Sequence, residues 1–106
     1  MALNDDVTVV VPARNRHDMT RRLLRSLAEA AQACQVVLVD DGSDPPLLPL
    51  VADFPGMRLR CLRNEQSQGP AVSRNLGLRH AQTALVAFTD NDVVVSPEWL
   101  ARLHAH

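Results

Sequence analysis

The sequence predicts an α/β fold, an open parallel sheet of strand order 3-2-1-4 with flanking helices. Short apolar, β-branched runs alternate with amphipathic stretches along the chain, a pattern typical of parallel strands joined by helical crossovers. One of the four predicted strands alternates apolar with charged residues, which puts it at a sheet edge. The 106 residues, of which 46% are hydrophobic and 22% charged, correspond to one globular domain. We therefore expect a single domain over residues 1–106.

The first half of the chain contains two predicted buried strands and the helix between them. Residues 7–12 and 35–40 are largely apolar and rich in valine, as in strands covered on both faces. Residues 18–33 have leucines and alanines on one helical face and arginines largely on the other, which predicts an amphipathic helix. Residues 47–54 follow two prolines and are compatible with a short helical segment.

The second half continues the alternation. Residues 57–62 alternate apolar and charged side chains and form the predicted edge strand. A helix begins at Gly69-Pro70 and ends near His80, and residues 84–89 form another buried strand. Ser96, with proline and glutamate directly after it, predicts the start of a last helix. With residues 57–62 at the edge, the strand order is 3-2-1-4.

In this order, strands 2 and 3 are added on one side of the first strand and strand 4 on the other, so the strand order reverses between strands 1 and 4. Ligands of open α/β sheets bind at such a switch point, beyond the carboxyl ends of the strands. Two acidic groups follow strand ends, namely Asp40 with Asp41 and Asp90 with Asp92. We expect both groups to face one crevice.

Composition argues against several classes of protein. The net charge of the chain is −1, whereas nucleic-acid-binding proteins usually have an excess of basic residues. No apolar run reaches the length of a membrane span, so we expect no membrane segment. All 11 basic residues are arginine, which excludes mechanisms that need a lysine. Two cysteines, Cys34 and Cys61, are too few for a disulfide scaffold and predict reduced thiols in a cytoplasmic protein.

Three motifs carry candidate chemistry, and each has a plain structural alternative. Asp90 and Asp92 suit a hard cation, Mg²⁺ or Mn²⁺, bound together with substrate phosphates, or they form a solvated turn. Asp41 can accept hydrogen bonds from a base or ribose, or Asp41-Gly42 is only a turn. The helix start with Arg74 can meet phosphate, or it is an ordinary capped helix.

Together these pieces resemble family 2 glycosyltransferases of the GT-A fold. Residues 9–15, VVVPARN, are similar to the first strand and turn of that family, and residues 37–43, VLVDDGS, to its V-V-D-D-G-S signature. Asn64 with residues 69–77 resembles its N-x-G-x-x-x-A-R-N-x-G stretch, and residues 86–100 resemble its F-L-D-x-D-D segment. Arg14 and the helix start are also similar to the mycofactocin-associated branch.

The resemblance implies a nucleoside-diphosphate sugar as ligand, with UDP-type donors favoured. In that family Asp41 would bind the base, Asp40 would support its loop, and Arg74 would approach the base or diphosphate. Asp90 would reach the ribose, and Asp92 would bind the metal that bridges the diphosphate. The implied nucleotide-binding residues are Pro12, Ala13, Asn15, Asp40, Asp41, Arg74 and Asp90, and the implied metal ligand is Asp92.

The sequence also departs from the family. Members are substantially longer, and their second half carries the acceptor site and the catalytic base, so we expect no catalytic base in this chain. Position 93 is valine where many relatives have a third acid. We therefore expect the donor-binding half of an inverting enzyme, truncated relative to the full protein, with an unknown acceptor.

Other function classes fit less well. A phosphatase with a DxD nucleophile, or a receiver-like signalling module, needs a lysine that this chain lacks. A nucleotide-binding module without turnover remains an alternative, because no catalytic base is expected here. Finally, residues 84–89 are apolar although the predicted order makes them an outer strand, so we expect a homodimer that covers this edge.

Overall fold

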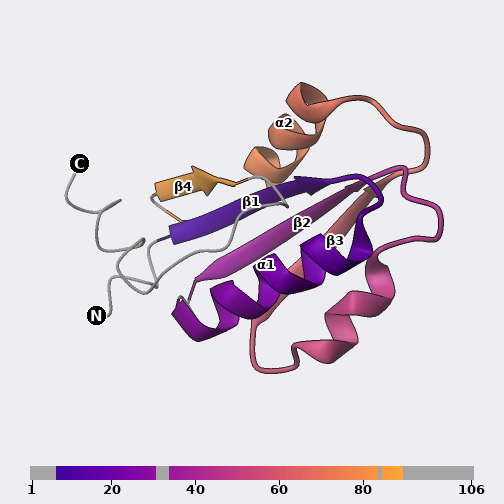
Figure 1. Cartoon of the computed structure of the whole chain (residues 1–106). Helices are drawn as coiled ribbons and strands as arrows, with labels where there is room; N and C mark the ends of the chain where they lie inside the picture. The colour runs from indigo at the N-terminus through magenta and orange to yellow at the C-terminus, as the bar shows by residue number, and fades with distance from the viewer. Residues whose placement is uncertain (1–6, 31–33, 84, 90–106) are drawn as a thin grey trace.

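The computed structural model describes residues 7–30, 34–83 and 85–89 (Figure 1). Within these ranges the secondary structure follows the expected alternation of strands and helices. The elements in chain order are β1 (Val7–Ala13), α1 (His17–Ala30), β2 (Gln35–Asp41), the 3₁₀ helix η2 (Leu48–Asp53), β3 (Arg58–Asn64), α2 (Pro70–His80) and β4 (Leu85–Phe88).

The four strands form one parallel sheet in the order β3-β2-β1-β4, which confirms the predicted topology. The register aligns the carboxyl ends of three strands. Ala13 of β1 lies opposite Asp40 of β2, and Asp41 lies opposite Asn64 of β3. The loops that leave these strands therefore start side by side at one end of the sheet, the end where the strands finish (Figure 1).

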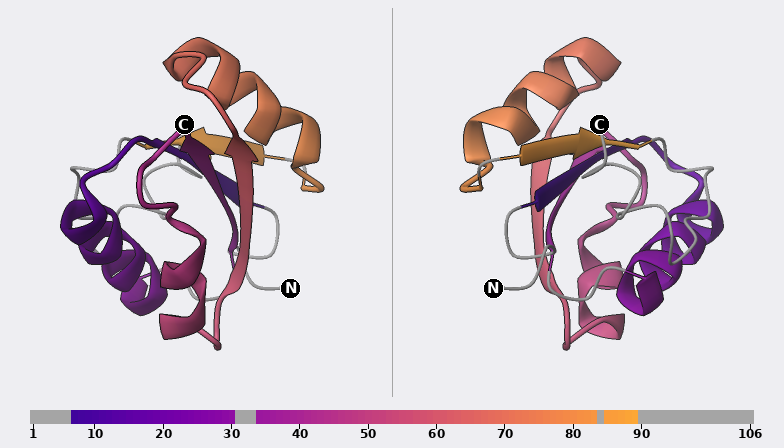
Figure 2. Two further views of the ribbon diagram at one scale, coloured as in Figure 1. Left: turned by 90° about the vertical axis from the view of Figure 1, so that its right-hand side faces the viewer. Right: turned by 90° about the vertical axis from the view of Figure 1, so that its left-hand side faces the viewer.

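Helices cover both faces of the sheet. Figure 2 shows α1 and η2 on one face and α2 on the other. Successive residues of β1 serve the two layers, because Val9 and Val11 pack in the core beneath α1 whereas Val10 packs toward α2 with Val37. This two-sided burial explains why β1 and β2 are apolar at nearly every position.

The edge strand β3 has the alternation that its sequence predicts. Arg58 and Arg60 are exposed, whereas Leu59 and Cys61 are half-buried against the core beneath α1. The strand continues to Asn64, two residues beyond the predicted end, because Arg63 and Asn64 pair in register with the acidic end of β2.

Two further expectations are partly outside the described residues. The first helix runs over His17–Ala30, and residues 31–33, where the sequence predicts its last turn, lie outside the described ranges. The helix predicted from Ser96, together with Trp99, also lies outside them. None of the helices within the described ranges is long and apolar enough to cross a membrane.

Helix α2 approaches β1 closely at Gly77. A Cβ atom added to Gly77 would lie 2.3 Å from Cγ1 of Val10, which is buried under the helix. The absence of a side chain at position 77 thus lets α2 rest directly on the strand and fixes the height of the helix above the sheet.

We expect Gly77→Ala to lower the free energy of unfolding by about 1–3 kcal/mol, because overpacking outweighs the better helix propensity of alanine. Urea unfolding measures the change. Gly56→Ala is the control, since a Cβ atom there meets nothing within 4 Å. A Gly77→Ala midpoint at or above that of Gly56→Ala would contradict the close packing.

Candidate functional site

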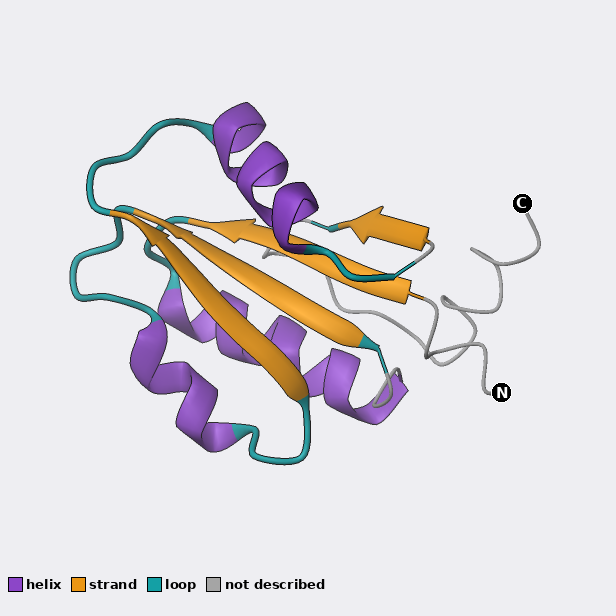
Figure 3. Cartoon of the chain, turned by 180° about the vertical axis from the view of Figure 1, so that it is seen from behind, coloured by secondary structure: helices purple, strands orange, loops and turns teal. Residues whose placement is uncertain are grey.

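The loops after β1, β2 and β3 gather at one end of the sheet (Figure 3). The loop after β3 is the one that leads into α2. A pocket of about 460 Å³ lies there. Its lining combines the turn after β1, the end of β2 and the start of α2. The lining residues are Pro12, Ala13, Arg14, Arg16, Asp41, Ser67, Gly69, Pro70, Ser73 and Arg74.

Four of the residues implied by the resemblance line this pocket, namely Pro12, Ala13, Asp41 and Arg74. Asn15 and Asp40 are not part of the lining and hydrogen-bond to neighbouring loops instead. Asp90 and Asp92 lie outside the described residues.

Asp41 accepts hydrogen bonds on both carboxylate oxygens. The Gln68 N–H and the Asn64 side-chain amide donate to Oδ1 at 2.7 and 2.9 Å. The Ser67 hydroxyl and the Gly69 N–H donate to Oδ2 at 2.8 and 3.0 Å. A carboxylate has about four acceptor positions, so these donors occupy the full capacity of Asp41. They fasten the connection between β3 and α2 to the end of β2.

This environment fixes the charge of Asp41. Burial alone would raise the pKa of the carboxyl group, but the donated hydrogen bonds, that of the Gln68 N–H first, outweigh burial and lower its pKa to about 2. Asp41 is only 5% exposed. The pocket therefore holds an anion that stays ionised at neutral pH.

Gly42 makes room for this arrangement. Its φ of +75° is in the left-handed region, and an added Cβ atom would lie 2.7 Å from the backbone nitrogen of Ser67. Position 42 therefore needs glycine for both its conformation and the close approach of the segment that carries the donors to Asp41.

Gly42→Ala should push residues 66–69 away from Asp41 and lower the free energy of unfolding by about 1–3 kcal/mol, from backbone strain and lost hydrogen bonds. Amide hydrogen exchange at Gln68 and Gly69 should accelerate together with this loss. Unchanged protection of both amides would contradict the contact between Gly42 and this segment.

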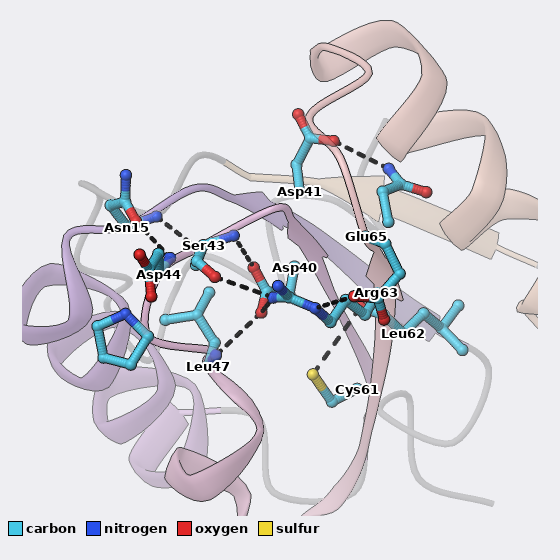
Figure 4. Close-up of polar contacts among 12 residues, drawn as sticks. Asn15, Asp40, Asp41, Ser43, Asp44, Leu47, Cys61, Leu62, Arg63 and Glu65 are labelled. Carbon is cyan, nitrogen blue, oxygen red and sulfur yellow. Dashed lines mark hydrogen bonds and ion pairs between the residues drawn. The ribbon is translucent and has the colours of Figure 1, made fainter.

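Asp40 faces away from Asp41, as successive strand residues do. Figure 4 shows its carboxylate among the backbone of the next loop and the side chain of Arg63. Oδ1 accepts the Ser43 N–H at 2.9 Å, and Oδ2 accepts the Leu47 N–H at 2.9 Å and the Arg63 Nη1 at 2.7 Å. Burial would raise the pKa of this fully buried carboxyl group, but these donors lower it below its ordinary value. Asp40 is therefore a buried anion that shapes the loop after β2.

Asn15 connects this loop to the turn after β1. Its N–H donates to the Ser43 hydroxyl oxygen at 2.7 Å, and its side-chain oxygen accepts the Asp44 N–H at 2.9 Å (Figure 4). Asn15 and Arg16 have φ values of +54° and +52°. Two consecutive non-glycine residues are thus held in the left-handed region at the rim of the pocket.

Sequence reasoning missed Arg14, Arg16 and Ser67 as residues of the lining. The two arginines flank Asn15 in the turn after a buried strand, and their position beyond the carboxyl end of that strand could have identified them. Ser67 lies in the middle of an irregular connection, and no pattern distinguishes it there.

The described residues alone do not form a cation site. No group of three or more His, Cys, Asp or Glu side chains within the described ranges could hold a metal ion. Asp41 is the acidic residue of the pocket lining, and its oxygens are already engaged. Any divalent ion at this pocket would need further oxygen ligands, from outside the described residues or from a bound substrate.

Curated proteins similar to this chain are glycosyltransferases and polysaccharide biosynthesis proteins. The pre-mycofactocin glycosyltransferase of Mycobacterium tuberculosis is 42% identical over 103 residues, which cover 95% of this chain and 21% of that protein. The succinoglycan biosynthesis protein ExoO of Rhizobium meliloti is 37% identical over 99 residues, covering 92% of this chain and 28% of that protein. The chain thus spans less than a third of the length of either relative.

Solved structures of GT-A glycosyltransferases have the same fold. The crystal structure of S. aureus TarS 1–349 matches with a TM-score of 0.83 and 30% identity, over 94% of this chain and 31% of TarS. Mannosyltransferase PcManGT from Pyrobaculum calidifontis, in complex with GDP-Man and Mn²⁺, matches with a TM-score of 0.78 and 26% identity, over 91% of this chain and 32% of that chain. The sequence profile of glycosyl transferase family 2 matches residues 8–106. With its signatures and its sheet order, this chain belongs to glycosyl transferase family 2.

Proposed function

We propose that this chain is the donor-binding part of an inverting glycosyltransferase, and that its pocket binds a nucleoside-diphosphate sugar of the UDP type together with Mg²⁺ or Mn²⁺. The observation that carries the proposal is the pocket itself. It combines an ionised, rigidly held Asp41 with Arg74 at the start of α2, beyond the carboxyl ends of the strands.

The chemistry of the lining supports this assignment. The carboxylate of Asp41 can accept a base N–H that takes the place of one of its four present donors, and a helix N-terminus with an arginine favours a phosphate group. In the proposed complex Asp41 contacts the base, Pro12 and Ala13 lie along the nucleotide, and Arg74 approaches the base or diphosphate. Asp40 and Asn15 support the two loops that border the nucleotide, through the hydrogen bonds described above.

Asp90 would reach the ribose and Asp92 would bind the metal. When bound, a divalent ion neutralises charge on the diphosphate leaving group. PcManGT, whose structure contains GDP-Man and Mn²⁺, supports a nucleotide-sugar and metal ligand in this fold. Its base is guanine, so the preference of this chain for uracil rests on the sequence resemblance and needs its own test.

Thermal unfolding with UDP, GDP, dTDP and ADP, each with Mn²⁺ or with EDTA, tests the proposal. We expect UDP with Mn²⁺ to raise the melting temperature most. A ligand at 100 times its Kd adds about 2.7 kcal/mol to the free energy of unfolding. Asp92→Asn should remove the increase due to Mn²⁺. Identical melting under all conditions would contradict a donor site.

The activity of the whole protein extends this proposal. We expect the 106-residue chain to bind nucleotide without transferring sugar, because the catalytic base would lie in the part that the relatives have in addition. Metal-dependent transfer to an alcohol by this chain alone would contradict that division.

The free thiols of Cys34 and Cys61 support a reducing compartment such as the cytoplasm.

We also propose that a second copy covers the outer edge of β4 when this chain is alone. Within the described residues β4 pairs with β1 only, and Phe88 is 46% exposed. Pairing along this edge would satisfy its backbone groups and cover Phe88. Light scattering should detect a dimer, which Phe88→Lys should weaken, whereas a monomer at high concentration would contradict the proposal.

A further inference from the structure

Among the described residues, the lining of the pocket carries more positive than negative charge, although the chain as a whole has a net charge of −1. Three arginines, Arg14, Arg16 and Arg74, are among the described lining residues, together with one acidic residue, Asp41. The arginines come from two elements, the turn after β1 and the helix α2. The donors to Asp41 are uncharged, so none of these three arginines is paired with it through those hydrogen bonds.

The backbone of the turn that carries Arg14 and Arg16 is held in place by the residue between them. Asn15 is bonded through both its backbone and its side chain to the loop after β2, at 2.7 and 2.9 Å. The backbone of Asn15 and Arg16 has positive φ, a conformation that is uncommon for L-residues, although asparagine adopts it more readily than most. The side chain of Asn15 thus turns to the neighbouring loop while the arginines on either side of it line the pocket.

The two arginines are available to a ligand. Both are exposed, and neither forms an ion pair with a carboxylate of the described residues. The guanidinium group of Arg16 makes a weak contact of 3.8 Å, from Nη1 to the sulfur of Met19. Guanidinium groups bind phosphate oxygens through paired, charge-assisted hydrogen bonds, and a site held in advance loses little entropy on binding.

We infer that Arg14 and Arg16 bind the diphosphate of the donor directly, and that this part of the affinity does not depend on the metal ion. The inference rests on the proposed donor site and assigns the diphosphate contact to residues of the turn after β1. Arg14 and Arg16 supply cations from the turn after β1 and Arg74 supplies one from α2, so that the diphosphate lies between the turn and the start of α2.

Isothermal titration of UDP, uridine and pyrophosphate into the 106-residue chain in EDTA tests this inference. The wild type should bind UDP without metal, and the double variant Arg14→Gln/Arg16→Gln should bind it about tenfold or more weakly, since a charge-assisted hydrogen bond contributes at least that factor. Pyrophosphate binding should weaken in parallel, whereas uridine binding should stay unchanged. Added salt should reduce the difference by screening.

The matched control is Arg22→Gln/Arg25→Gln, which removes the same charge from exposed positions of α1 outside the pocket. The single variant Arg14→Gln leaves the positive-φ residues intact and should lose part of the UDP affinity. Equal UDP affinity of the double variant and its control would overturn the inference, as would an equal loss of uridine binding, which would indicate a collapsed turn. A wild type that binds no UDP even with Mn²⁺ would instead refute the proposed function.

Discussion

Replacing Arg63 by methionine should lower the free energy of unfolding by about 3 kcal/mol, because it leaves a buried carboxylate without its counter-charge. Asp40 is fully buried, and Arg63 donates to it at 2.7 Å and to the Ser43 carbonyl at 3.1 Å. Methionine keeps most of the side-chain volume but neither hydrogen bond. Urea unfolding gives the change, and Arg60→Met, an exposed position on the same strand, is the control.

The same variant should change how stability depends on pH. In the wild type the pKa of Asp40 is lowered, so its contribution is present above the pKa of the unfolded chain and is lost as pH falls through the folded value. Without Arg63 the folded pKa rises, and the acid loss of stability should begin at higher pH than in Arg60→Met. Superimposable pH profiles of the two variants would exclude a supporting role of the ion pair.

Asp41→Asn should have the other large effect, on stability and on ligand binding together. Each carboxylate oxygen of Asp41 receives two donors, so the amide group of asparagine would face at least two donors with a donor of its own. Unsatisfied buried groups cost about 1–3 kcal/mol each, so we expect a loss of roughly 2–4 kcal/mol. Binding of UDP should fall below detection, because the released segment carries part of the pocket.

Acid titration isolates the charge of Asp41. With a folded pKa of about 2 against the ordinary value of 3.8, its carboxylate contributes about 2 kcal/mol above pH 4, which is lost as pH falls from about 4 toward 2. Asp41→Asn should lack this part of the acid loss, whereas Asp44→Asn, at an exposed position, should retain it. Equal acid profiles of these two variants would contradict the low pKa of Asp41.

The sheet order could be predicted because one feature decides it. Charged residues alternate with apolar ones from Arg58 to Leu62 and nowhere else among the predicted strands, so this strand had to lie at an edge. Once the edge is assigned, right-handed crossovers leave few topologies. The candidate site followed from the same logic, because parallel strands bring Asp41 and the turn after Pro12 to one end of the sheet.

Asp40 and Asp41 have different hydrogen-bond partners, and these depend on tertiary contacts that no local sequence pattern reveals. Their opposite directions follow from strand geometry, but the pairing of Asp40 with Arg63 depends on the register of β2 and β3. The placement of Arg14 and Arg16 depends on a left-handed backbone at Asn15 and Arg16, and the sequence has no glycine there to indicate this conformation. Such contacts arise from tertiary structure rather than from local propensity.

A crystal structure of this chain grown with UDP and Mn²⁺ tests the central claim, a nucleotide-sugar donor site, most directly. We predict the uracil ring at Asp41 and the diphosphate between the turn after Pro12 and the start of α2, with Arg14, Arg16 and Arg74 within hydrogen-bond distance of phosphate oxygens. Nucleotide density elsewhere on the molecule, with this pocket holding only solvent, would contradict the account.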